Sequence, residues 1–137
     1  MYQSFESLEV WKRSSRLAVQ IYRALKDCRD YGLKDQMTRA AVSIPSNIAE
    51  GYERDTNAEF IRYLNIAKGS AAELRTQIYI AKEIGELNAE KSQELIDEAK
   101  GISAMLHALA KVRKERINED PDDAPEFDPP EPDHPEP

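Results

Sequence analysis

Residues 56–85 read TNAEFIRYLNIAKGSAAELRTQIYIAKEIG, and their apolar side chains return every three or four positions. The repeating residues are Phe60, Leu64, Ala67, Ala71, Leu74, Ile78 and Ala81. Such spacing places them on one face of an α-helix. Thr56 and Glu59 stand where the two residues of an N-terminal capping box belong, and Gly85 suits the position just beyond a helix C-terminus. The stretch therefore predicts a long amphipathic helix with defined ends.

Three further segments have the same helical periodicity. The first runs from about Phe5 to Cys28, the second begins near Gly32, and the last begins after Asn88, which suits an N-cap. The predicted core-facing residues are Leu8, Trp11, Ser15, Ala18, Tyr22 and Leu25 in the first, Leu33, Met37, Ala40, Ile44, Ile48 and Gly51 in the second, and Leu95, Ala99, Ile102, Leu106 and Leu109 in the last. Pro45 interrupts the second segment, but the apolar spacing keeps its phase, so one kinked helix is expected.

Four amphipathic helices joined by short connectors predict an all-α fold, an antiparallel up-down-up-down four-helix bundle formed by residues 1–117. Several helices carry more apolar residues than one bundle seam needs. The surplus residues are Val10, Leu17, Ile21, Ile61, Ile66, Ile80 and Ile84. We expect a homo-oligomer to bury them.

Charge is unevenly distributed along the chain. The 137 residues carry a net charge of −7, from 26 acidic and 19 basic side chains. Residues 118–137 hold nine of the acids, no Lys or Arg, and seven of the eight prolines, which leaves 17 acids against 19 bases, about +2, in residues 1–117. This composition predicts a disordered acidic proline-rich tail. The tail is either a solubilising extension or a segment that folds back on the basic residues before it.

Cysteine usage and the N-terminal sequence bear on the cellular compartment. The single Cys28 cannot form an intramolecular disulfide, which favours a reducing environment. The first residues lack the basic and apolar regions of a signal peptide, and no run approaches the roughly 18 apolar residues of a membrane span. We therefore expect a cytoplasmic protein with no membrane partner.

Polar rows accompany the apolar faces of the second and third predicted helices. They consist of Gln36, Arg39, Ser43, Asn47, Glu50 and Arg54 on the second helix and of Ser70, Glu73 and Gln77 on the third. We predict that the two rows meet in a hydrogen-bonded network in which Arg39 or Asn47 pairs with Glu73. The alternative is that both rows are solvated surfaces.

A long motif spans these two helices: Gln36-x-x-Arg39-Ala40-x-x-Ser43-Ile44-Pro45-x-Asn47-Ile48-Ala49-Glu50-Gly51, then Glu59-Phe60 and Gly69-Ser70-x-x-Glu73-Leu74. With the opening Phe5-x-x-Leu8-x-Val10-Trp11, it resembles the bacterial four-helix-bundle proteins encoded inside intervening sequences of 23S rRNA genes. The resemblance covers nearly all of residues 5–115. It implies an antiparallel bundle that assembles into a ring-shaped homopentamer. It also implies similarity to accessory proteins of diversity-generating retroelements, which bind a reverse transcriptase and its template RNA through basic surfaces.

The residue inventory argues against an enzyme. A ferritin-like di-metal site needs Glu-x-x-His pairs, but His107 has Ala104 at that offset and His134 lies in the tail. The chain has no glycine-rich phosphate-binding loop, and Cys28 has no His near it in sequence, so we expect an inert buried thiol. We expect no catalytic residue, no metal, no cofactor and no small-molecule substrate.

RNA binding is the leading functional class, because phosphate contacts require clustered cations. Two clusters qualify: Lys12, Arg13, Arg16 and Arg23 on the first helix, and Lys111, Arg113, Lys114 and Arg116 at the end of the last. No aromatic stacking platform is evident beside them. One alternative is that both clusters are ordinary solvated helix faces. The other is a protein-interaction scaffold, for example for a reverse transcriptase, without direct nucleic-acid binding.

Overall fold

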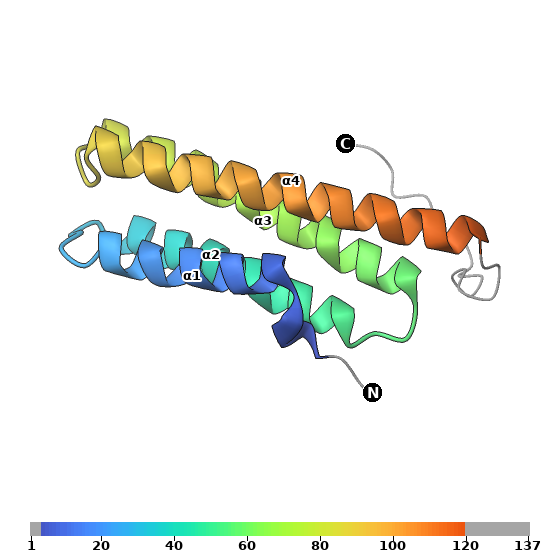
Figure 1. The fold of residues 1–137 in the computed structure, drawn as a ribbon. Coiled ribbons are helices and arrows are strands. Elements are labelled where there is room, and N and C mark those ends of the chain that lie inside the picture. Colours follow the sequence, from blue (N-terminus) through green and yellow to red (C-terminus); the bar gives the residue numbers. More distant parts are fainter. Residues whose placement is uncertain (1–3, 120–137) are drawn as a thin grey trace, which may run out of the picture.

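The computed structural model describes residues 4–119, which form four helices and no strand (Figure 1). The helices are α1 (Glu9–Ala24), α2 (Tyr31–Tyr52), α3 (Asn57–Glu83) and α4 (Ala89–Glu119), and a 3-10 turn, η1 (Phe5–Ser7), precedes α1. The predicted all-α up-down-up-down bundle is confirmed. Helix α2 continues through Pro45 as one element, as expected from the unbroken apolar phase.

The last helix is longer than predicted. Helix α4 continues to Glu119, two residues past the expected domain boundary at residue 117. The remainder of the predicted tail, residues 120–137, lies outside the described residues, and so does its predicted disorder.

Each helix packs on two neighbours. Helix α1 packs on α2 and α4, and helix α3 packs on the same two helices from the other side. Figure 1 shows α1 with α2 as one layer and α3 with α4 as the other. At 1.5 Å per residue, α4 is about 46 Å long and α1 about 24 Å, so the C-terminal turns of α4 extend beyond α1. Those turns lie beside the start of α3.

The helix ends are defined by the side chains that the sequence suggested. The Thr56 hydroxyl accepts from the Glu59 amide at 3.1 Å, and the Asn88 side-chain oxygen accepts from the Lys91 amide at 2.7 Å. Gly85 has a φ of 82°, a left-handed conformation in which its amide donates to the Lys82 carbonyl at 3.1 Å. These bonds satisfy backbone groups that a helix end otherwise leaves unpaired.

The core of α2, α3 and α4 is the one predicted from periodicity. All seven predicted residues of α3 are buried, as are Met37, Ala40, Ile44, Ile48 and Gly51 of α2 and Leu95, Ala99, Ile102 and Leu106 of α4. Leu33 and Leu109 are only partly buried at the edge of this core.

The predicted core face of α1 is only partly right: Ala18 and Leu25 are buried as predicted. Tyr22 is 54% exposed, whereas Val10, Leu17 and Ile21, which the sequence assigned to a surplus outer face, are buried. Two apolar faces overlap on this helix. The buried one also holds Ser14, whose hydroxyl donates to the Trp11 carbonyl at 3.1 Å, whereas Tyr22 keeps its hydroxyl at the surface. Trp11 stays at the edge, where its ring packs edge-on against Phe5 at a centroid distance of 5.2 Å.

Ser43 and Ser70 join α2 to α3. Their hydroxyl oxygens lie 2.9 Å apart in a hydrogen bond. The Asn47 side-chain amide donates to Ser43 Oγ at 2.9 Å and to the Ser43 carbonyl at 2.8 Å. This part of the predicted network between α2 and α3 is confirmed.

The predicted pairing of Glu73 with Arg39 or Asn47 is wrong. Glu73 is exposed and accepts from Gln77 of its own helix at 3.4 Å, and Arg39 donates to Asp35 of its own helix at 2.9 Å. Both charged groups stay in water because burying them between the helices costs more solvation than one ion pair returns. Gln36, the first member of the predicted row, is exposed as well.

Gly51 lets the last turns of α2 approach the first turns of α3. A Cβ atom at Gly51 would overlap Cβ of Tyr63 and lie 3.2 Å from a ring carbon of Phe60. Beside this contact, Arg54 donates to the Tyr63 hydroxyl at 2.6 Å and to the Glu50 carboxylate at 3.0 Å. The motif residues Glu50 and Gly51 therefore build the joint between α2 and α3.

Arg13 and Glu98 join α1 to α4. Arg13 donates from Nε to Oε1 at 2.6 Å and from Nη2 to Oε2 at 3.1 Å, and the two side chains are 35% and 30% exposed. This hydrogen bonding raises the pKa of the Arg13 guanidinium above its ordinary value. Gly101 leaves room for the guanidinium, since a Cβ there would overlap Nη2. The pair has the paired geometry that makes arginine–carboxylate contacts strong.

We predict that Gly51→Ala lowers the free energy of unfolding by about 2–3 kcal/mol, because the new Cβ meets a Cβ that cannot move without shifting α3. Gly69→Ala is the matched control, since its Cβ would meet nothing within 4 Å. In mid-helix, that change should raise stability by up to about 1 kcal/mol. Urea unfolding followed by circular dichroism measures both, and effects of the same sign would contradict the close approach.

We predict that Arg13→Met lowers the free energy of unfolding by about 1–2 kcal/mol, because the Glu98 carboxylate then loses its partner at a half-buried site. The control Arg16→Met, on the exposed side of the same helix, should change stability by less than about 0.5 kcal/mol. Adding Glu98→Met to Arg13→Met should recover part of the loss. If Arg13→Met and Arg16→Met behave alike, the ion pair does not hold α1 to α4.

Candidate nucleic-acid interface

The cations predicted on α1 do not form one free surface. Lys12 pairs with Glu9 at 3.6 Å, and Arg13 is held in its ion pair with α4. Arg16 and Arg23 are exposed and line a shallow hollow of about 310 Å³ on the surface of α1. Two available cations are a small basis for phosphate binding.

The cations predicted at the end of α4 divide into two groups. Arg113 donates to the Asn57 side chain at 2.9 Å, and its guanidinium lies 5.0 Å from the centre of the Phe60 ring. It therefore holds the end of α4 on the start of α3. Arg116 is exposed further along α4, while Lys111 and Lys114 belong to a different site.

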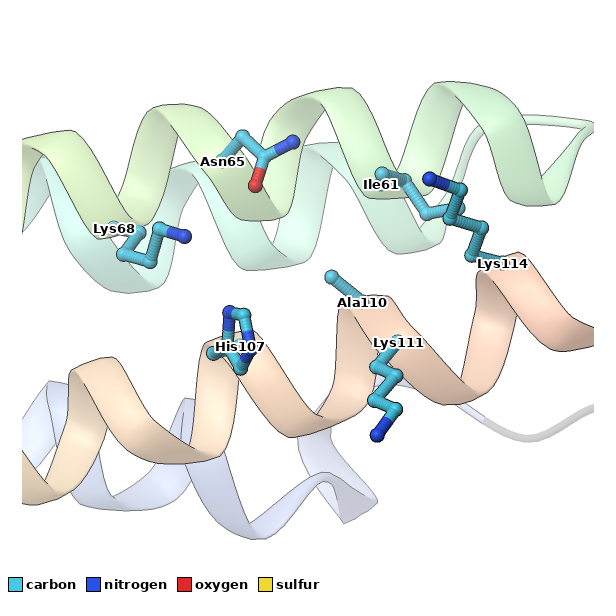
Figure 2. Close-up of a pocket in the computed structure, with 7 residues that line it drawn as sticks. All are labelled: Ile61, Asn65, Lys68, His107, Ala110, Lys111 and Lys114. Carbon is cyan, nitrogen blue, oxygen red and sulfur yellow. The ribbon is translucent and has the colours of Figure 1, made fainter.

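Lys111 and Lys114 line a surface cavity of about 420 Å³ between α3 and α4 (Figure 2). The other lining residues are Ile61, Asn65, Lys68, His107 and Ala110. Figure 2 shows Lys68 and His107 pointing into the space between the helices from opposite sides, and Lys114 reaching toward Ile61. Lys111 points away from α3 along the outer side of α4. The cavity thus has an apolar floor and basic walls.

Lys68 and His107 each belong to a row of basic residues with heptad spacing. The rows are Lys68, Arg75 and Lys82 on α3, and Lys100, His107 and Lys114 on α4. Seven residues make almost two full turns, so each row stays on one side of its helix. Together with Lys111, we call these residues the basic seam.

The register of the two helices places the two rows side by side. The cavity brings Lys68 near His107 and Ile61 near Lys114, and the helices are antiparallel. Extending this register by one heptad sets Arg75 opposite Lys100. The same register sets Lys82 one heptad beyond Lys100, so the two rows are offset, and the basic seam repeats about every 10.5 Å along a length of about 32 Å from Lys82 to Lys114.

The basic seam holds six cations that lack acidic partners. Within residues 4–119, none of its lysines or its arginine takes part in an ion pair. Asp97 is three residues before Lys100 and Glu115 is four after Lys111, but neither acid forms an ion pair with them in the described part of the chain. The positive charge of the seam is thus available to an external anion.

An exposed aromatic residue lies on the same side of α3. Tyr79 is 46% exposed, four residues after Arg75 and three before Lys82. The expectation that no aromatic platform is present concerned the two clusters predicted from the sequence and did not cover this surface. A ring at such a position offers a face on which an unpaired base can stack.

The sequence-based prediction of the RNA surface did not include Lys68, Arg75, Lys82 and Lys100, because it rested on cations close together along one helix. The heptad spacing of each row is readable in the sequence and could have been noticed. Their union on one surface depends on the packing of α3 against α4, which the spacing alone does not reveal.

Three further features of the described residues concern metal binding, the cysteine and membrane insertion. Within residues 4–119, no group of three or more His, Cys, Asp and Glu side chains is placed to hold a metal ion. Cys28 is buried as predicted, and this burial raises the pKa of its thiol. Of the four helices, none combines the length and hydropathy needed to cross a membrane.

Comparisons with known proteins agree with the fold. A crystal structure of a protein with unknown function from the S23 ribosomal protein family of Bacteroides thetaiotaomicron is 25% identical, with a TM-score of 0.70. The match covers 74% of this chain and 98% of that one. A comparison with curated proteins finds no match. The family model described as 23S rRNA-intervening sequence protein matches residues 6–108, nearly the whole bundle, and this chain therefore belongs to that family.

Proposed function

We propose that this protein is a non-enzymatic, homo-oligomeric accessory factor that binds RNA through the basic seam. The observation that carries the proposal is the register that sets the heptad rows of α3 and α4 side by side. It concentrates six cations on one surface of a body whose net charge is only about +2. The setting we propose is the cytoplasm, where the single Cys28 stays reduced.

Phosphate binding supplies the affinity in this proposal. Each phosphate that meets a lysine or arginine releases condensed counterions, and the gain requires no particular base sequence. A strand lying along the seam would meet cations over about 32 Å. Tyr79, between two members of the α3 row, favours a single strand with unstacked bases over a duplex.

Self-association is the second part of the proposal. Ile66, Ile80 and Ile84 are 41%, 47% and 53% exposed and fall on one side of α3. Ile66 lies about 160° around α3 from Lys68, so an interface there leaves the basic seam open. Burial between subunits would account for these side chains. The pentameric number comes from the family resemblance.

The alternative function is a scaffold that binds a protein partner, for example a reverse transcriptase, without contacting RNA itself. The same three isoleucines favour it, because an exposed apolar row on one helix also suits a partner protein. In that case the cations of the basic seam form only a solvated surface and bind no ligand.

We predict that light scattering returns five times the 15.6 kDa mass of the chain. The pair Ile80→Glu and Ile84→Glu should reduce this mass to that of one subunit, because charges cannot be buried in the interface. Val112→Glu, at a position of similar exposure on α4, is the control and should leave the mass unchanged. A wild-type protein of monomeric mass would contradict the assembly.

We predict that Lys68→Glu with Arg75→Glu weakens binding of a fluorescein-labelled oligouridylate of about 20 nucleotides at least tenfold in about 50 mM salt. The control is Arg16→Glu with Arg23→Glu, which has the same charge change and the same heptad spacing on α1. It should retain most of the affinity. Fluorescence anisotropy measures both pairs. Lys100→Glu with Lys114→Glu changes two exposed sites of the seam and should weaken binding as well, which separates loss of seam charge from misfolding of the first pair.

Salt dependence gives a second measure of the same contact. If a single strand meets all six cations, the logarithm of the affinity should fall with the logarithm of salt with a slope of about −4, and loss of two cations should reduce this slope by about 1.4. These measurements use the chain ending at Glu119. Failure of that chain to bind at low salt, or equal losses in the seam pair and the α1 pair, would reject the basic seam as the RNA surface.

A further inference from the structure

The acidic tail and the basic seam have opposite charge and adjoin one another in the chain. Residues 120–137 contain eight acids and no Lys or Arg: Asp120, Asp122, Asp123, Glu126, Asp128, Glu131, Asp133 and Glu136. We infer that this segment binds along the basic seam of its own subunit and there competes with RNA. The competition rests on the proposed function, whereas the binding of the tail does not.

The seam ends where the tail begins. Figure 1 shows the C-terminal end of α4 beside the start of α3, and the Arg113–Asn57 hydrogen bond places the same two segments together. Lys114, at this end of the seam, is five residues before Glu119. A chain leaving α4 therefore starts next to the first cation of the seam.

The tail is long enough to follow the whole seam. From Glu119 back to the level of Lys82, one heptad beyond Lys100, is 26 residues of helix, about 39 Å. The 18 residues from 120 to 137 span about 56 Å in an extended proline-rich conformation. About two-thirds of the tail therefore suffices to turn back and reach the far end of the seam.

The spacing of the acids fits the spacing of the cations. A polyproline helix has three residues per turn and rises about 9 Å per turn. In that conformation, acids three positions apart fall on one side. The tail has three such series, each on a different side of a polyproline helix: Asp120, Asp123 and Glu126, then Asp128 and Glu131, then Asp133 and Glu136. The first series can therefore face the seam with three acids, and the others can follow only where the chain turns about its axis. Within each series the repeat of about 9 Å is close to the seam repeat of about 10.5 Å.

Covalent attachment favours binding of the chain's own tail to the basic seam over binding of a free acidic segment. A short flexible connection holds the attached segment at an effective concentration in the millimolar range. A free acidic segment would have to reach that concentration to compete. Because the contacts are between exposed charges, added salt should release them.

The binding is tested without RNA by comparing amide NMR spectra of the full chain with those of a variant whose eight tail acids are replaced by Asn or Gln. This variant keeps the length and the prolines of the tail. At low salt, amides of residues 66–84 and 98–114 should differ between the two spectra, and those of α1 should not. The differences should vanish in about 1 M salt. Identical spectra for these residues at low salt would overturn the inference.

Two controls decide whether the seam of the same subunit is the binding surface. Lys68→Glu with Arg75→Glu should abolish the spectral differences, and Arg16→Glu with Arg23→Glu should preserve them. An isotope-labelled chain ending at Glu119 is also mixed with unlabelled full chain. The amide resonances of the labelled chain should not shift in this mixture, because each tail binds its own subunit. Shifts in that mixture would overturn binding within one subunit.

The competition is tested by anisotropy with the same labelled oligouridylate. Removal of residues 120–137 should raise affinity at least tenfold in about 50 mM salt, and neutralising the eight acids should have the same effect. If the spectra show the tail bound but neither chain binds RNA, the proposed function fails and the tail contact stands. If all forms bind RNA equally and the spectra do not differ, the tail contact fails and the proposed function stands.

Discussion

The apolar face of α3 has to be covered from two sides, by α2 and by α4, and the rest of the structure follows from how these two contacts are made. On the α2 side, small residues allow close approach: Gly51 has no side chain to hold the helices apart, and Ser43 and Ser70 meet through their hydroxyls. On the α4 side, longer side chains surround a surface cavity. Close packing on one side and a lined cavity on the other give α3 two different edges.

Those two edges suit different partners. The edge near α2 carries exposed isoleucines, which gain by being removed from water, while the edge near α4 carries lysines and an arginine, which gain by meeting anions. Separation around the helix keeps the two from interfering. Under the proposed function, a subunit associates through one edge while the other remains open to RNA.

Net charge conceals this organisation. The total of −7 describes neither the bundle nor the tail, because the acids after Asn118 outnumber the small positive excess of the bundle. Within the bundle, cations that the sequence pattern does not distinguish have different roles. Arg13 and Arg113 hold helices together, and Lys68 and Lys114 line an open cavity. Only the partners of each side chain distinguish a structural cation from one that is free to bind.

Much of the fold was predictable because helix formation is local. The periodicity of residues 56–85, the Thr56 cap and the left-handed Gly85 follow from short-range sterics and hydrogen bonding, and the structure confirms each. The α1 face was partly mispredicted because two apolar faces overlap there, and local spacing cannot say which one α2 and α4 will cover. The pairing of Glu73 failed for a related reason, since solvation of a charge depends on where the helix edge lies.

The sequence alone thus determined the number of helices, both ends of α3, most of the buried faces and the family, since these depend on residues near one another in the chain. The tertiary structure decided which rows of residues became neighbours. It joined Arg13 to Glu98, and it brought together Lys68 and His107, which are 39 positions apart in the sequence. Helix register and azimuth are set by side-chain packing over the whole bundle, and no local pattern contains that information.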